Sequence, residues 1–190
     1  MSLNLEKLNE NLDAKKIYDI LNTDEEDVVC LFVGGCVRDL ISNREILDVD
    51  FATSLTPDKI KRKLEASNIE YDNSFENYGS IKIRLNEKSF EVNTLRKDFD
   101  QDGRHSEVIF TQDWRQDALR RDFTINAIYC DINGRIYDPF KGVDDLNNGI
   151  IRFIGDPIKR IQQDYLRALR YFRFFICLLY TSDAADEHSW

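Results

Sequence analysis

An apolar run that ends in two glycines, VVCLFVGG at residues 28–35, most strongly constrains how this chain can fold. Such a run predicts a short buried strand closed by a tight turn, and VRDLIS at 37–42 has the pattern of a helix start. A second strand is predicted by EILDVDFAT at 45–53. The capping hydroxyl of Thr56 and the proline after it predict a further helix. Strands that alternate with helices are typical of mixed α/β and α+β folds.

The middle of the chain predicts a hairpin and then a long loop. SIKIRL at 80–85 and SFEVNTL at 89–95 alternate between apolar and polar residues around a turn at residues 86–88. Two alternating runs joined by a loop of about three residues predict an antiparallel hairpin. The polar stretch RKDFDQDGRHSE at 96–107 predicts an extended loop.

Helical spacing marks both ends of the chain. Residues 5–22 carry leucine and isoleucine at helical intervals, and residues 113–131 predict a helix followed by a strand. Asn133 and Gly134 predict another tight turn. After Gly155, residues 158–175 predict one last helix. Because the strands stop before this helix, we expect a change of domain near residue 150.

Composition narrows the class of protein. The chain of 190 residues is 42% hydrophobic and 32% charged, which is typical of a folded domain rather than a disordered one. No apolar run reaches the roughly 18 residues of a membrane span, and the polar start is unlike a signal peptide. The four cysteines lie far apart, which disfavours a zinc site or a disulfide framework and favours the reducing cytoplasm. A net charge of −9 disfavours a surface that coats nucleic acid nonspecifically, although a local basic groove stays compatible with it.

The turn at Gly34 and Gly35 is a candidate phosphate site. Glycines between a strand and a helix leave backbone N–H groups free to cradle a phosphate, and Arg38 adds a fixed cation. The alternative is a tight turn without a ligand, which is the commoner role of a bare pair of glycines.

Asp48 and Asp50 are candidate metal ligands. Two residues apart on a predicted strand, they are expected to share one face, where Mg²⁺ would offset their repulsion. An EF-hand loop is excluded, because Ala52 and Thr53 occupy the positions of its third ligand and its glycine. Glu91, in the second hairpin strand, is a possible third carboxylate. The alternative is that all three acids simply face water.

Two polar strings complete the candidate site. RRDFTINA at 120–127 offers cations for phosphates and an acid or amide for ribose hydroxyls, unless its Arg-Asp pairs are ordinary surface ion pairs. In the predicted last helix an acid and three arginines recur every three residues, which allows an Asp-Arg pair to hydrogen-bond a base edge. The alternative for that helix is an ordinary amphipathic surface. The candidates in the two strings are Arg120, Arg121, Asp122, Asn126, Asp164, Arg167, Arg170 and Arg173.

Seven strings in register resemble class II tRNA nucleotidyltransferases, the CCA-adding enzymes, and the related bacterial poly(A) polymerases. They are GGCVRD, LDVDFAT, FEVNTLRKD, DGRH, RRDFTINA, IGDP and QDYLRALRYFRF, and the similarity as a whole runs from about residue 31 to 174. The resemblance implies a polymerase-β-like head with a mixed sheet flanked by helices, over residues 1–150. It also implies the start of an all-helical neck over 151–177.

The resemblance also implies roles for the candidate residues. Gly34, Gly35 and Arg38 would hold the triphosphate. Two Mg²⁺ ions would bind Asp48 and Asp50 with Glu91 in support, while Arg121, Asp122 and Asn126 would fix sugar and phosphates. Asp164 and Arg167 would read the base of ATP or CTP. Arg104 and His105 would belong to a flexible element that switches the pocket from CTP to ATP.

The implied activity is addition of CCA to the 3′ end of tRNA, with pyrophosphate as the product. Close alternatives are a CC-adding or A-adding relative or a poly(A) polymerase, and a distant one is a non-catalytic nucleotide-binding module. The chain departs from the family pattern at Gln163, where the base-reading string usually begins with Glu. Residues 178–190 also differ, and LLYTSDAADE at 178–187 resembles translated sequencing adapter. We therefore expect a longer natural protein with further neck, body and tail helices.

Overall fold

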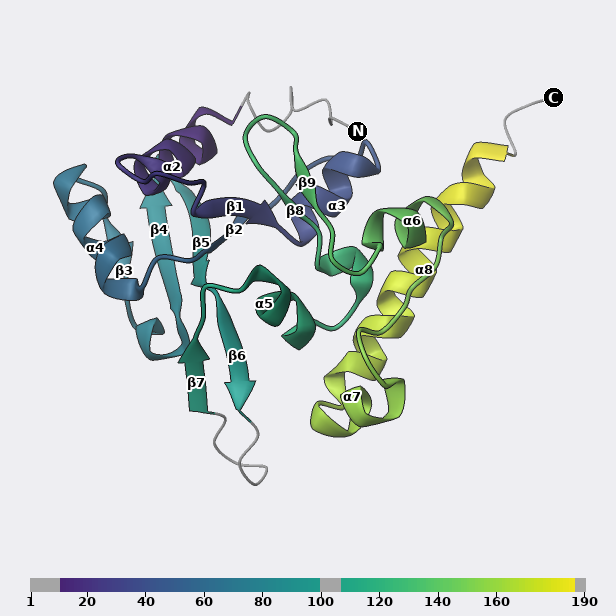
Figure 1. Ribbon diagram of the computed structural model, residues 1–190. Coiled ribbons are helices and arrows are strands. Elements are labelled where there is room, and N and C mark those ends of the chain that lie inside the picture. The colour runs from purple at the N-terminus through teal and green to yellow at the C-terminus, as the bar shows by residue number, and fades with distance from the viewer. Residues whose placement is uncertain (1–10, 100–106, 187–190) are drawn as a thin grey trace.

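The computed structural model describes residues 11–99 and 107–186 and shows a mixed seven-stranded sheet flanked by helices (Figure 1). The strand order is β3-β4-β5-β2-β1-β8-β9, with β2 and β5 parallel and the other neighbours antiparallel. The predicted fold class is confirmed. The strands of this sheet are β1 (Cys30–Val33), β2 (Asp50–Thr53), β3 (Tyr71–Asp72), β4 (Ser80–Leu85), β5 (Lys88–Thr94), β8 (Tyr129–Cys130) and β9 (Ile136–Tyr137).

The helices lie around the sheet and in the C-terminal third of the chain. Figure 1 shows α2 and α4 on one side near β4, while α7 and α8 occupy the opposite end of the molecule. The α-helices are α2 (Leu12–Asn22), α3 (Gly35–Ile41), α4 (Pro57–Ala66), α5 (Trp114–Arg120), α6 (Gly142–Asn147), α7 (Pro157–Gln163) and α8 (Leu166–Asp186). Two 3-10 turns are η1 (Glu76–Tyr78) and η2 (Thr124–Asn126).

Local sequence explains several of these boundaries. The side chain of Thr56 accepts a hydrogen bond from the Lys59 N–H at the start of α4, as its capping role predicted. The β4–β5 hairpin turns on Asn86 and Glu87, both with positive φ (49° and 65°), so that Leu85 pairs with Lys88. Two central residues with positive φ give the tight turn that matches strand twist, so the loop is one residue shorter than predicted.

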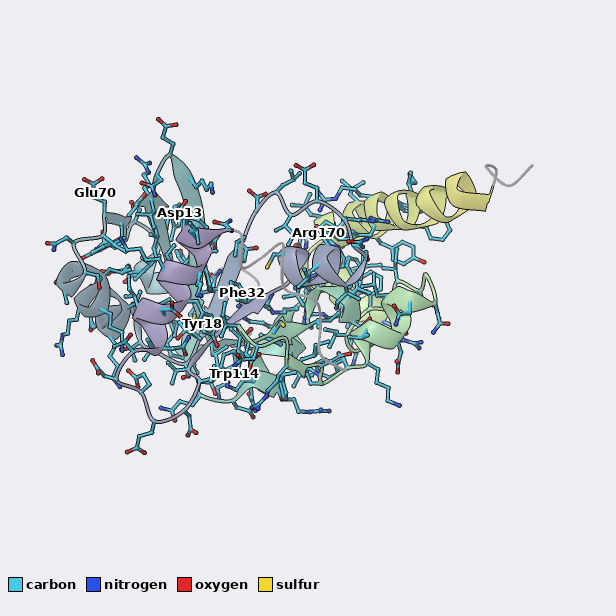
Figure 2. The ribbon with its side chains drawn as sticks, turned by 90° about the horizontal axis from the view of Figure 1, so that it is seen from above. Asp13, Tyr18, Phe32, Glu70, Trp114 and Arg170 are labelled. Carbon is cyan, nitrogen blue, oxygen red and sulfur yellow. The ribbon has the colours of Figure 1, made fainter. Side chains whose placement is uncertain are left out.

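The main core lies between the sheet and the pair α2 and α4. Tyr18 of α2 stacks on Phe32 of β1, with ring centroids 5.3 Å apart, and Phe32 contacts Phe51 of β2 (Figure 2). From β4, Ile81 and Ile83 point into the same core and are fully buried. A smaller cluster on the other face packs α5 against the sheet. The second cluster positions the polar residues at the end of α5.

Two predicted elements, the loop at 96–107 and the single last helix, were wrong. Part of the predicted loop at 96–107 forms strand β6 (Arg96–Phe99), which pairs with β7 (Glu107–Phe110) in a second sheet. The helix and the strand predicted over 113–131 are found as α5 and β8, and α5 ends at Arg120 because Arg121 is extended and η2 follows. The single last helix is broken into α7 and α8 at Asp164, whose extended backbone (φ −155°) and side chain bonded to the Leu166 N–H form an Asx turn.

The C-terminal assignments stay predictions. Residues 178–186 continue α8, and the hypothesis that they are adapter sequence is untested. The division at residue 150 is also untested, although the contacts of α8 cross it: Phe174 packs edge-on against Phe123, with ring centroids 5.7 Å apart. Within the described ranges no helix is long and apolar enough to span a membrane.

Candidate active site

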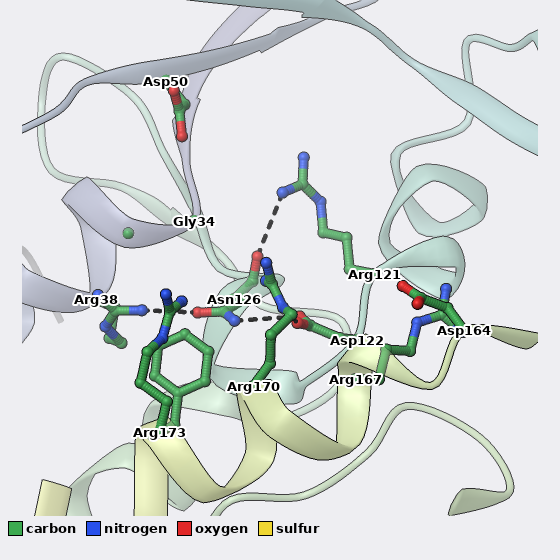
Figure 3. A pocket seen from close by; sticks show the side chains of 12 residues that line it. Gly34, Arg38, Asp50, Arg121, Asp122, Asn126, Asp164, Arg167, Arg170 and Arg173 are labelled. Atoms are coloured by element: carbon green, nitrogen blue, oxygen red, sulfur yellow. Dashed lines mark hydrogen bonds and ion pairs between the residues drawn. The ribbon is translucent and has the colours of Figure 1, made fainter. Parts of the chain in front are cut away.

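A polar pocket of about 430 Å³ lies between the start of α3, β2, η2 and α8 (Figure 3). It brings together candidates that are more than a hundred residues apart in sequence. It is lined by Gly34, Gly35, Arg38, Asp50, Arg121, Asp122, Asn126, Asp164, Arg167, Arg170, Arg173 and Phe174. The lining therefore contains five arginines opposite a smaller number of acids, which suits an anionic ligand.

The glycine turn forms one wall of the pocket. Gly34 has φ 75°, which an L side chain rarely adopts, and α3 begins at the next residue. Arg38, one turn into α3, donates a hydrogen bond to Asn126 Oδ1 (2.9 Å) and pairs with Asp39. The turn and the cation thus lie side by side, as the sequence predicted.

Asp50 forms the floor of the pocket, and Asp48 does not line it. Burial, then repulsion from Glu91, raises the pKa of Asp50 to about 6, against a smaller opposing effect of Arg121. Glu91 is the register partner of Asp50 on the parallel strand β5 and accepts a hydrogen bond from Ser80 Oγ (2.8 Å). These two carboxylates share a face, which is one of the two arrangements that the sequence left open for Glu91.

Asp48 lies outside strand β2, so whether it shares a face with Asp50 stays a prediction. Strand β2 begins only at Asp50, because β1, its neighbour, ends at Val33, which is paired with Asp50. Asp48 is therefore an exposed residue before the strand, although its charge still contributes to the raised pKa of Asp50. In the described part of the chain, no group of three or more His, Cys, Asp or Glu side chains is arranged to hold a metal ion.

Arg121 is held by a buried carboxylate that sequence analysis missed. Asp117, with 1% of its side chain exposed, accepts hydrogen bonds from Arg121 Nη2 (3.1 Å) and the Tyr129 hydroxyl (2.8 Å). Burial alone would raise the pKa of Asp117, but Arg121 and Arg120 lower it overall. Arg120 pairs with the other oxygen of Asp117 and does not line the pocket.

A second network joins η2 to α8. Asp122 Oδ1 accepts hydrogen bonds from the Phe123 N–H (2.8 Å) and Asn126 Nδ2 (3.1 Å), and its Oδ2 pairs with Arg170 (2.6 Å). Because Asn126 also accepts from Arg38, a continuous chain of polar contacts runs from α3 to α8. Figure 3 shows these contacts along the base of the pocket.

Three guanidinium groups surround the ring of Phe174. The Cζ atoms of Arg38 and Arg173 lie 5.0 Å from its centroid, and that of Arg170 lies 6.0 Å away. Aromatic rings attract cations at such distances. In the described part of the chain, Arg173 has no hydrogen bond or ion pair, so its donors are available to a ligand.

The helix break carries the remaining candidates. Arg167 Nη1 donates to Gln163 Oε1 (3.0 Å) and to the Arg160 carbonyl, while Arg160 also donates to Gln163 (2.8 Å). Asp164 and Arg167 both line the pocket and lie next to each other at its edge in Figure 3. The predicted Arg104 and His105 lie outside the described residues.

Gly142, at the start of α6, supports η2 from behind. A Cβ atom there would lie 2.2 Å from the Thr124 carbonyl oxygen, so only glycine allows this approach. Next to it, Thr124 donates to Asp145 Oδ2 (2.7 Å), which pairs with Arg152.

Helical spacing is the sequence signal that could have indicated Asp117, because Asp117 stands three and four residues before two arginines. Gly142 and Phe174 have no such signal.

Comparisons with known proteins agree on one family. The model of the Poly A polymerase head domain matches residues 30–152. CCA tRNA nucleotidyltransferase 1, mitochondrial, of Danio rerio is 50% identical over 143 residues, which are 75% of this chain and 33% of that protein. The CCA-adding enzyme of Staphylococcus epidermidis is 41% identical over 160 residues, 83% of this chain and 39% of its own length.

Solved structures give the same answer. The Bacillus stearothermophilus CCA-adding enzyme in complex with CTP has a TM-score of 0.75 and 34% identity, and the match covers 89% of this chain and 39% of that one. A tRNA nucleotidyltransferase complexed with a primer tRNA and an incoming ATP analog has a TM-score of 0.63 and 28% identity. The match covers 77% of this chain and 41% of that one. The chain thus spans about a third to two fifths of these relatives. With its family model covering well over half its length, the chain belongs to the Poly A polymerase head domain family.

Proposed function

We propose that this chain is the catalytic head of a tRNA nucleotidyltransferase that adds CCA to tRNA 3′ ends from CTP and ATP. The observation that carries the proposal is the single pocket in which the glycine turn and Arg38 meet Asp50 and the pair Asp164 and Arg167. The names of the relatives and the CTP and primer-tRNA complexes of similar structures support it.

The arginines suit a triphosphate. Arg38, Arg121, Arg170 and Arg173 face one cavity, and guanidinium groups bind phosphate oxygens through paired hydrogen bonds. Arg120 does not line the pocket and would act indirectly, because its guanidinium pairs with Asp117, the carboxylate that also holds Arg121. Asp122 and Asn126, which hold Arg170 and Arg38 in the free protein, would orient the sugar and these cations together.

Asp50 and Asp48 would hold Mg²⁺, with Glu91 in support. The fit is chemical: burial and the neighbouring acids raise the pKa of the half-buried Asp50 carboxylate more than Arg121 lowers it, so a further cation would stabilise its charged form. Mg²⁺ binds one or two carboxylates together with substrate phosphates. When bound, two such ions would lower the pKa of the RNA 3′-hydroxyl and offset charge on the leaving pyrophosphate.

The reaction is an in-line displacement at phosphorus. The 3′ oxygen of the RNA forms a bond to the α-phosphorus, the bond to the bridging oxygen breaks, and pyrophosphate leaves as the hydroxyl proton passes to water. The residues of this chain fix the triphosphate from one side and present a base-recognition pair, Asp164 and Arg167, at the pocket edge. Such positioning supplies most of the catalysis in phosphoryl transfer.

The decisive test supplies tRNA lacking its 3′ CCA with labelled CTP, ATP and Mg²⁺, and resolves the products on a denaturing gel. Growth by three nucleotides, abolished in the double variant Asp48→Ala, Asp50→Ala, is the expected result. Growth by two nucleotides, by one, or by a long ladder of A would assign the chain to the CC-adding, A-adding or poly(A) alternatives.

A second candidate is a nucleotide-binding module without catalysis. The exposed position of Asp48 before β2, and the absence of a preformed metal cluster among the described residues, favour it. It predicts that the chain binds Mg·ATP with no incorporation into tRNA.

The cytoplasm remains the predicted compartment, while the Danio rerio relative is mitochondrial by name.

A further inference from the structure

The sheet has an open polar face beyond the nucleotide pocket. In the β4–β5 hairpin, Ile81 and Val92 are fully buried on the α2 and α4 side. The paired residues Lys82 and Glu91 therefore point to the opposite face, because side chains alternate along strands and register partners share a face. Asp50, the register partner of Glu91 on β2, lies on this same face.

The geometry of the displacement reaction assigns this face to the RNA 3′ end. The pocket lies on the α3 and α8 side of Asp50, and none of its lining residues comes from β4 or β5. An in-line displacement requires the attacking and leaving oxygens on opposite sides of the phosphorus. With the triphosphate at Arg38 and Arg173, the attacking 3′ oxygen approaches Asp50 from the side of Glu91 and β4.

Three exposed aromatic side chains border this approach. Phe75, directly before η1, is 51% exposed, Tyr78, the last residue of η1, is 56% exposed, and Phe110 of β7 is 39% exposed. The Phe110 ring packs on Gly79, where an added Cβ would lie 2.9 Å from Phe110 Cε1. We call Phe75, Tyr78 and Phe110 the aromatic platform.

Two contacts of the segment from Ser80 to Lys82 connect the platform to Glu91, the register partner of Asp50. Lys82 Nζ lies 5.7 Å from the centroid of Phe75, and Ser80, directly after Gly79, donates to Glu91. Neighbouring strands lie about 4.8 Å apart, so Lys82 is roughly 10 Å across the sheet from Asp50. The last nucleotides of an RNA could span this interval.

Resting on the proposed function, we propose that the aromatic platform stacks the bases next to the RNA 3′ end while Lys82 contacts their phosphate. Stacking on aromatic side chains contributes about 1–3 kcal/mol per base and tolerates any base, which suits tRNAs of different sequence. Asp72 is the register partner of Lys82 on β3, and its charge offsets part of that of Lys82.

The test measures RNA binding without turnover, using the full 190-residue chain. The probe is an acceptor-stem minihelix lacking CCA, with fluorescent 2-aminopurine as its 3′-terminal base, titrated with protein and no nucleotide. The wild type should quench the fluorescence through stacking. The double variant Phe75→Leu, Tyr78→Leu should lose the quenching and bind at least tenfold more weakly, with unchanged affinity for ATP.

Controls separate the possible outcomes. Tyr137→Leu, which removes another exposed aromatic ring on β9, should bind and quench like the wild type. Quenching retained in the double variant, or absent in the wild type, would overturn the platform whatever the gel assay shows. Self-association of the wild type that the double variant abolishes would instead assign the platform to a second copy of this chain. Failure of nucleotide transfer with quenching intact would count against the proposed function alone.

Discussion

Arg121 donates hydrogen bonds to Asp117 Oδ2 from both Nε (3.3 Å) and Nη2 (3.1 Å), so one edge of its guanidinium is fixed and the other faces the pocket. Asp117→Asn should therefore weaken both folding and ATP binding. Removing one partner of a buried ion pair costs about 3–5 kcal/mol. Tyr129→Phe, which removes only one hydrogen bond to Asp117, should cost about 1 kcal/mol in urea unfolding.

The cost of Asp117→Asn should depend on pH. The pKa of Asp117 is lowered in the folded protein, so its ionised form adds stability above the unfolded pKa of about 4, and this is lost as pH falls through the folded pKa. The stability difference between wild type and variant should be constant from pH 6 to 8 and shrink below pH 4. Unfolding free energies at several pH values measure it, and a difference that grew on acidification would contradict this account.

Asp50→Asn should stabilise the metal-free protein and abolish its response to Mg²⁺. The pKa of Asp50 is raised to about 6, so ionisation at neutral pH opposes folding by on the order of 1–3 kcal/mol. The variant removes that charge and the ligand together. Thermal melts with and without Mg²⁺ provide the measurement: the wild type should gain stability with Mg²⁺, and the variant should start higher and stay unchanged.

Two neighbouring arginines on α8 should behave differently. Arg170 pairs with Asp122, whereas Arg173 faces Phe174 with its donors available. Arg173→Gln should lower the affinity for ATP about tenfold, the value of a hydrogen bond to a charged group, with stability within about 0.5 kcal/mol of wild type. Arg170→Gln should lower stability as well, by roughly 1 kcal/mol. Equal losses of stability would show that both arginines act structurally.

Gln163→Glu should strengthen the junction of α7 and α8. Gln163 Oε1 accepts from Arg160 (2.8 Å) and Arg167 (3.0 Å), and a carboxylate there would lie between two cations. Because Gln163 is exposed, the gain should be about 0.5–1 kcal/mol and should fade in 1 M salt. A gain that persisted at high salt would indicate packing rather than charge.

The sequence predicted the elements whose signals are local. The glycine turn at Gly34, the cap at Thr56 and the alternation of the β4–β5 hairpin each depend on neighbouring residues, and each is found. Pairing across distance was less predictable. The strands β6 and β7 are four residues each, joined through a polar segment, so their alternation was too short to separate from loop.

The candidate site shows the same contrast between local signals and contacts between distant segments. Motifs identified Asp50, Arg121 and Asp164 as pocket residues, but the contacts that hold them came only from the fold. Asp48 was predicted to lie in β2 but precedes it, because β2 pairs with β1 only from Asp50 onward and alternation within one strand does not reveal where its neighbour ends. The break at Asp164 depends on a side chain that bonds its own backbone, which competes with the helical pattern around it.

The close approach of Gly142 to the Thr124 carbonyl has a genetic consequence. Even alanine at position 142 would push η2 away from α6, and η2 carries Asn126, which holds Arg38. A residue with no side chain and no place in the pocket thus controls the spacing of η2 and α3, which carry Asn126 and Arg38. Inherited loss of activity could arise there from a single added methyl group, and a screen restricted to charged residues would overlook it.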